Sequence, residues 1–224
     1  MKKHSVVLLI LFLASCRSLT FQDMRLNDAS PQPLPPLEAI VDVSSLENAY
    51  SAGKVTVDTY YSPYSRYGTY GSSTGRIVKD PRVQDAVNLF QRDVKENLTR
   101  SAGQTAGFIR MKILNSSESR CFMCMFGSML TAFTVNLFSV PLDYHSQTTE
   151  YEFEIFDVNK NPVARYVELT RSKTPIALWR GYVPATAERR DALMTLKQAL
   201  FNLHRKVQRD FAQINNNLAK GNAQ

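Results

Sequence analysis

Cysteine, histidine and tryptophan are scarce in this 224-residue chain, which contains three, three and one of them. Three cysteines are too few for the framework of several disulfides that holds small secreted domains together. The single Cys-x-x-C pair, Cys121 and Cys124, has no second pair and no histidine pair beside it. A structural zinc site needs four such ligands, so we expect no metal site and no cofactor.

Long apolar runs are also scarce, and the first one extends only from Val6 to Leu13. It follows two lysines, Lys2 and Lys3, and leads into small residues that end at Cys16. A helix needs about 20 apolar residues to cross a bilayer, so this run is too short to be a membrane span. The order of basic head, apolar run and small residues predicts a secretory signal peptide at residues 1–15.

The last residues of this segment, Leu13-Ala14-Ser15-Cys16, resemble the lipobox of bacterial lipoproteins. The resemblance implies cleavage before Cys16, a diacylglyceryl group and palmitate on that cysteine, and an N-terminal membrane anchor. The alternative is a secreted protein in which the cysteine is incidental. Arg17 is not the aspartate that retains many lipoproteins at the inner membrane. By the same resemblance the outer membrane is favoured, and we expect the domain to face the periplasm rather than the cell surface.

The net charge is moderately basic. Loss of Lys2 and Lys3 with the signal peptide lowers it from +7 to +5. Such an excess suits anionic lipid headgroups or cell-wall polymers, and it also occurs on proteins that bind neither. Because the chain is expected to be exported, we predict an envelope protein or cell-wall partner and no nucleic acid. Self-association stays open.

The mature chain is predicted to form one domain behind a tether. Four prolines between residues 31 and 36 favour extended, solvated chain, so residues 16–39 are expected to be the tether. The domain is placed at 40–219 and a disordered tail at 220–224. Alternation of apolar and polar residues at Val41, Val43 and 54–60 predicts strands.

A tyrosine-rich stretch follows, with no aliphatic residue to bury between residues 60 and 76. It is predicted to be a loop, either solvated without a ligand or presenting rings to a sugar or protein. The candidate contact residues are Tyr61, Tyr64, Tyr67 and Tyr70.

The rest of the pattern alternates between helix and strand. Asp80-Pro81 suits a helix start, and this helix is expected to end at Gly103. Residues 105–115 predict a strand with Ile109 on its apolar side, and 149–156 with 163–170 predict an antiparallel hairpin. Glutamates on one face of that hairpin are expected to be solvated beside Arg165 and Arg171. A long apolar stripe predicts a final helix over 186–218, with Asp210 interrupting the heptad.

Residues 121–142 contain no charged side chain. Their length equals that of a membrane span, but Asn136, Gly127 and Pro141 argue against one. We expect an apolar insert packed on the domain, with contact to a membrane or partner through Phe133 and Phe138 as the alternative. The Cys121 and Cys124 pair at its start could form a structural disulfide, remain as buried thiols or act as a redox centre.

Catalytic chemistry is offered mainly by Gly71-Ser72-Ser73-Thr74-Gly75, which matches the G-x-S-x-G nucleophile motif. That motif requires a strand before the serine and a helix after it, whereas Ser73 follows the tyrosine loop. The histidines left after cleavage are expected in a polar turn (His145) and in the last helix (His204). No carboxylate stands in a setting that marks a perturbed pKa.

These patterns predict an α+β fold with a mixed or antiparallel sheet of four to five strands, two helices on one face and the apolar insert. The element order, with the lipobox, loosely resembles that of small α+β envelope-assembly lipoproteins. We therefore expect a non-catalytic binding or assembly factor. The alternative is an envelope hydrolase or thiol-redox protein that uses Ser73 or the cysteine pair.

Overall fold

The computed structural model describes Leu19, Leu26 and residues 31–51, 80–100, 103–130, 141–177 and 181–221. Several residues singled out in the sequence lie outside these ranges: Cys16, Tyr61, Tyr64, Tyr67, Tyr70, Ser73, Phe133 and Phe138.

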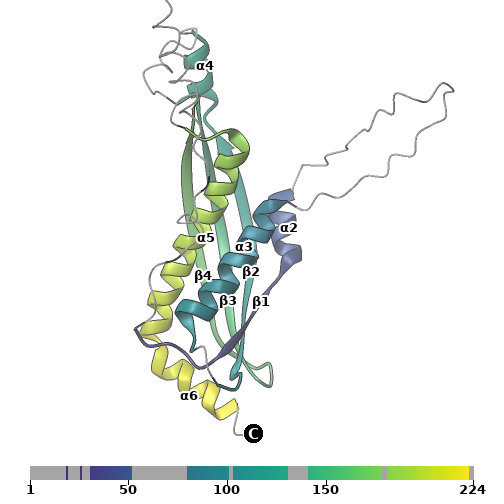
Figure 1. Ribbon diagram of the computed structural model, residues 1–224, viewed down its shortest axis with the longest axis vertical. Helices are drawn as coiled ribbons and strands as arrows, with labels where there is room; N and C mark the ends of the chain where they lie inside the picture. Colours follow the sequence, from purple (N-terminus) through teal and green to yellow (C-terminus); the bar gives the residue numbers. More distant parts are fainter. Residues whose placement is uncertain are drawn as a thin grey trace, which may run out of the picture.

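A four-stranded mixed sheet organises the domain (Figure 1). Its strands lie side by side in chain order: β1 (Leu37–Val41), β2 (Gly107–Arg120), β3 (Asp143–Asp157) and β4 (Pro162–Ile176). β1 is parallel to β2, while β2, β3 and β4 are antiparallel. The α+β class with a mixed sheet agrees with the prediction, at the lower of the two strand counts.

Strands β2 and β4 are longer than the sequence pattern indicates. β2 was expected to end near residue 115 and β4 near 170, yet they reach Arg120 and Ile176. Apart from Pro175 and Ile176 at the end of β4, the added residues are polar, so apolar alternation gives no sign of them. They form because β2 residues 116–120 pair in register with β3 residues 145–149. At about 3.3 Å per residue, the 15-residue β3 is close to 50 Å long.

Five α-helices and one π-helical turn occur among the described residues: α2 (Val43–Ser51), α3 (Pro81–Asp93), η2 (Val94–Leu98), α4 (Phe122–Leu130), α5 (Pro184–Arg209) and α6 (Phe211–Gly221). Two helices were expected, so the count was wrong. Val43 was assigned to a strand, but it begins α2, where Asp42 accepts the Ser45 amide. The long final helix is broken at Asp210, which ends α5 in a non-helical conformation.

The start of α3 agrees with its sequence signal. The Asp80 carboxylate accepts the Arg82 amide at 2.9 Å, and Pro81 occupies the first turn, where a missing N–H costs nothing. The helix ends earlier than expected, because η2 terminates at Leu98 and Thr99 is extended.

The core lies between one face of the sheet and the helices α2, α3 and α5. The predicted apolar sides of β2 and β3 both face it, with Ile109 and Phe153 fully buried. Phe90 of α3 stacks on Phe153 with 6.0 Å between ring centroids. Leu34 is also fully buried, so the packed domain begins before residue 40, inside the segment assigned to the tether.

The opposite face of the sheet carries a ladder of ion pairs. Glu154 forms an ion pair with Arg110, and Glu152 forms one with Arg165. Arg165 is therefore the cross-strand partner that was expected, but Glu152 is only 3% exposed rather than solvated. Arg171 donates instead to the Ser146 hydroxyl.

None of the helices in the described ranges combines the length and apolar character that crossing a membrane requires.

Candidate functional site

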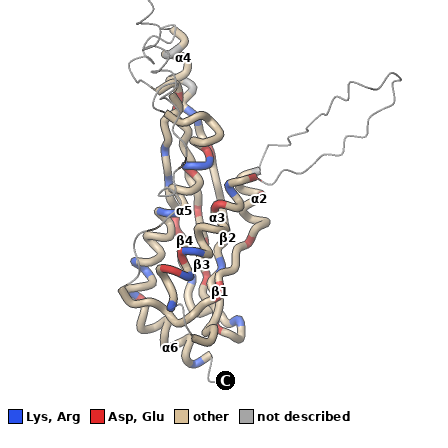
Figure 2. The backbone as a smooth tube through the Cα atoms, in the orientation of Figure 1, with Lys and Arg blue, Asp and Glu red and all other residues tan. Residues whose placement is uncertain are grey.

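Helix α4 connects β2 to β3 at one end of the molecule, opposite α6 (Figure 1). We call residues 121–130 the tip. Figure 2 shows no Lys, Arg, Asp or Glu on α4. Its large apolar side chains face solvent: Met123 (74% exposed), Met125 (45%), Phe126 (48%), Met129 (59%) and Leu130 (73%). The expectation that the insert packs on the domain was therefore wrong for this part of it.

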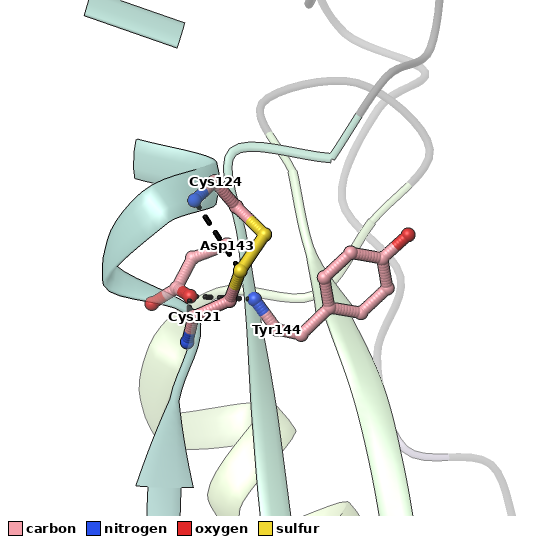
Figure 3. Close-up of a disulfide and its surroundings, with 4 residues drawn as sticks. All are labelled: Cys121, Cys124, Asp143 and Tyr144. Atoms are coloured by element: carbon pink, nitrogen blue, oxygen red, sulfur yellow. Dashed lines mark hydrogen bonds between the residues drawn. A yellow bond between two sulfur atoms is a disulfide. The ribbon is translucent and has the colours of Figure 1, made fainter. Parts of the chain in front are cut away.

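A disulfide between Cys121 and Cys124 clamps the first turn of the tip (Figure 3). The amide of Cys124 donates to the carbonyl oxygen of Cys121 at 3.0 Å. The Asp143 carboxylate, where β3 begins, accepts the amides of Cys121 (2.9 Å) and Tyr144 (2.6 Å). The helix is thus fastened to the sheet at its first residues.

Replacing both Cys121 and Cys124 with serine is expected to lower the free energy of unfolding by no more than about 2 kcal/mol. The bond closes a loop of very few residues, so it removes little entropy from the unfolded chain. The effect should instead be local, with faster amide hydrogen exchange across residues 122–130. Mass spectrometry of exchange together with a urea titration measures both. Unfolding of the whole domain in this variant would contradict the local role.

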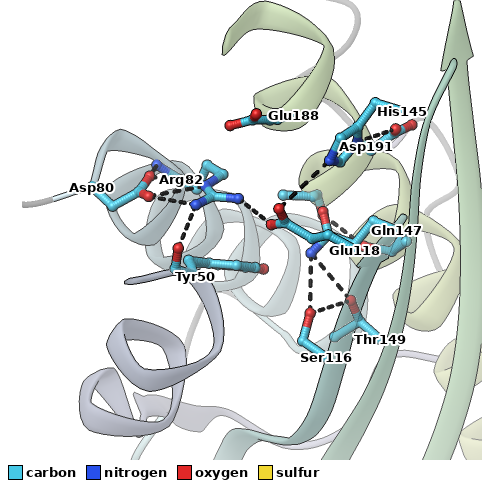
Figure 4. Close-up of polar contacts among 12 residues, drawn as sticks. Tyr50, Asp80, Arg82, Ser116, Glu118, His145, Gln147, Thr149, Glu188 and Asp191 are labelled. Carbon is cyan, nitrogen blue, oxygen red and sulfur yellow. Dashed lines mark hydrogen bonds and ion pairs between the residues drawn. The ribbon is translucent and has the colours of Figure 1, made fainter. Parts of the chain in front are cut away.

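Directly beneath the tip lies a polar cluster formed by Arg82, Glu118, His145 and Asp191 (Figure 4). Nδ1 of His145 is 2.7 Å from Oδ2 of Asp191. Nε2 of His145 is 3.6 Å from Oε2 of Glu118, a distance that fits an ion pair and is too long for a hydrogen bond. Oε1 of Glu118 also accepts a hydrogen bond from Nη1 of Arg82, at 2.5 Å.

Asp191 is fully buried, and both of its carboxylate oxygens have hydrogen-bond partners. Oδ1 of Asp191 accepts the hydroxyls of Ser172 and Thr174, each at 2.6 Å, while Oδ2 faces His145. Burial of a charge is costly unless it is paired and hydrogen-bonded, and Asp191 meets both conditions.

The charges in the cluster shift each other's pKa. Burial would lower the pKa of His145, but contact with Asp191 and Glu118 outweighs it and raises that pKa from 6.5 to about 9. The adjacent imidazolium of His145, then Arg82, hold the pKa of Glu118 at about 2. At neutral pH the cluster therefore contains a charged histidine between two carboxylates.

The cluster continues inward as a polar layer of the core. The amide of Gln147 donates to the hydroxyls of Ser116 and Thr149, each at 3.3 Å. Below it, the hydroxyls of Tyr151 and Thr195 lie 3.0 Å apart. A polar layer thus crosses the interior near the tip.

This arrangement ties together α3, β2, β3, β4 and α5 at the base of the tip. His145 is 1% exposed, so its ring does not face solvent, although the Glu118 side chain is one-third exposed. The cluster therefore fixes the positions of these elements at the base of the tip.

Two expectations about this region were wrong. His145 lies in β3 rather than in a polar turn, and Glu118 does have a strongly perturbed pKa. Residues 116–120 are polar throughout, so the sequence offers no alternation that would signal this part of the strand. His204 does lie in the long helix, where Nε2 is 2.8 Å from the buried Asp93.

Within the described parts of the chain, no three His, Cys, Asp or Glu side chains come together in a way that could hold a metal ion.

No protein-family model matches this chain, and no curated protein matches it. Among solved structures it is similar to a "putative lipoprotein" from Caulobacter crescentus CB15. The likeness has 13% sequence identity and a TM-score of 0.31, and it covers 62% of this chain and 79% of that chain. At this identity and score it assigns neither a fold nor a function.

Proposed function

We propose that the protein is a non-catalytic lipoprotein of the bacterial envelope, anchored in the outer membrane by lipid on Cys16 and acting as a binding or assembly factor. The observation that carries this proposal is the tip, where a clamped helix presents five large apolar side chains to solvent. Exposed apolar patches of this kind mark contact surfaces.

The anchoring part of the proposal is supported by the order of basic, apolar and small residues before Cys16. Several acyl chains on one residue anchor firmly, since each buried methylene contributes about 0.8 kcal/mol.

The non-catalytic part is supported by the surroundings of the groups that chemistry would need. His145 and His204 are 1% and 7% exposed, and each faces a buried aspartate. Cys121 and Cys124 are joined to each other, so neither is a free thiol in this structure.

Fractionation of cells tests the anchor, and complementation tests the role. Cys16→Ala is expected to move the protein from the membrane fraction to the soluble periplasm and to abolish complementation of a chromosomal deletion. Ser73→Ala and the double Cys121→Ser, Cys124→Ser variant should both remain membrane-bound and complement. Loss of complementation by the Ser73→Ala variant alone would favour a hydrolase.

A further inference from the structure

We propose that the tip inserts into the surface of the same lipid bilayer that holds Cys16, giving the domain a second membrane contact. This inference rests on the proposed function, because it takes the lipid on Cys16 as given.

The size and composition of the tip suit shallow insertion. At 1.5 Å per residue, the nine-residue α4 is about 13 Å long, far short of a bilayer core. Segments that lie in the interface bury their apolar side chains roughly 5–10 Å into the headgroup and acyl boundary. The apolar face of α4, with Phe126 and Met129 on it, needs no greater depth.

Basic and aromatic side chains lie at the base of the tip. The Lys173 ammonium lies 4.2 Å from the centroid of the half-buried Tyr144 ring. Arg120, the last residue of β2, pairs with Glu188 and keeps 53% of its side chain exposed. Tyrosine and basic side chains are enriched at the headgroup level of membrane proteins, where anionic lipids attract the cations.

The N-terminal segment approaches the tip along α5. The carbonyl of Gln32 accepts Nε2 of Gln208, close to the end of α5. Six residues earlier, Leu26 lines a groove with Met194 and Phe201, nearer the start of that helix. Followed backwards, the chain therefore leads from the α6 end of the molecule toward the tip.

The lipid is attached close to the folded domain. Leu19 and Leu26 both pack against the hydrophobic core, so the N-terminal segment stays on the domain to within three residues of Cys16. Those three residues span up to roughly 10 Å when extended. An anchor this close holds the domain against the bilayer, which brings the tip within reach of the same membrane.

Depth-dependent quenching tests the inference on the full lipidated protein. Met129→Trp and the control Leu169→Trp, on β4, both replace exposed side chains, and each is made with Trp179→Phe so that the introduced tryptophan is the sole one in the chain. Each variant is reconstituted into vesicles of phosphatidylethanolamine and phosphatidylglycerol carrying brominated acyl chains. We expect loss of fluorescence from residue 129 and no loss from residue 169.

Vesicle binding by the unlipidated Cys16→Ala chain provides a second measurement. It should co-sediment with the same lipids, and adding Phe126→Glu with Met129→Glu should weaken binding by roughly tenfold or more. Leu169→Glu is the matched control, expected to leave binding unchanged. All three replaced side chains are exposed, so the melting temperature should stay constant across the variants.

Three results separate the possibilities. An acylated Cys16 with no quenching at residue 129 overturns the inference and leaves the proposed function intact. Absence of lipid on Cys16 overturns the proposed function itself. Self-association that the Glu variants abolish, without vesicle binding, assigns the tip to a second copy and also overturns the inference.

Discussion

Replacing Asp191 with alanine is expected to lower the free energy of unfolding by about 3–5 kcal/mol. The substitution leaves the charged His145 buried without its closest partner. It also removes the acceptor of the Ser172 and Thr174 hydroxyls, which then lose hydrogen bonds of 2.6 Å. Urea denaturation followed by circular dichroism measures the change.

Two further variants show whether this loss comes from the cluster. Asp191→Asn keeps the shape of the side chain and removes its charge, so we expect an intermediate loss. Glu38→Gln removes the same charge from an exposed strand position and should change stability by about 0.5 kcal/mol or less. Equal effects of Asp191→Ala and Glu38→Gln would contradict the importance of the cluster.

Stability is expected to fall as the pH rises from 6.5 through 9. The pKa of His145 is raised from 6.5 to about 9 in the folded protein, so folding favours the protonated ring. Its contribution is complete below pH 6.5 and lost as the pH passes 9, amounting to roughly 3 kcal/mol at most. Glu118 acts in the opposite direction, because its pKa is lowered from 4.5 to about 2 in the folded protein. Its contribution to stability is present above pH 4.5 and is lost as the pH falls through about 2.

The pH dependence is measured by urea titrations at half-unit steps between pH 5 and 10. The His145→Gln variant should be less stable than the wild type at pH 6. Its free energy of unfolding should not show the decline between pH 6.5 and 9 that is assigned to His145. The groups that face this ring, Glu118 from β2 and Asp191 from α5, stay in place in that variant. An NMR titration of the wild-type imidazole that gives an ordinary pKa would contradict the account.

The sequence predicts those parts of the fold in which burial follows a period. Ile109 and its apolar neighbours on β2, and Phe153 on β3, face the core as their alternation indicates. Asp80 with Pro81 predicts the start of α3 because the cap is a local interaction. The apolar stripe also predicts the helical residues after 184, although the single helix expected to reach 218 is divided at Asp210.

The polar half of the interior could not be predicted in this way. His145 and Thr174 are buried because both bond to the Asp191 carboxylate, which the fold brings to β3 and β4 from α5. Apolar periodicity carries no information about such partners, so the strand extensions and the charged cluster were missed.

The position of the tip also depends on tertiary structure. Uncharged residues such as Met123 and Phe126 resemble a core segment in sequence, and burial was the natural expectation. They are exposed because β2 and β3 carry them beyond the first turn of α5, where no other described element covers them. An uncharged stretch of sequence therefore does not show by itself whether its side chains are buried or exposed.

The central claim is that Cys16 carries the membrane anchor, and mass spectrometry of the protein extracted from its native membrane tests it most directly. The account predicts a mature chain that begins at an acylated Cys16, and a Cys16→Ala protein that is no longer retained by the membrane. A mature chain that begins elsewhere and carries no lipid would contradict it.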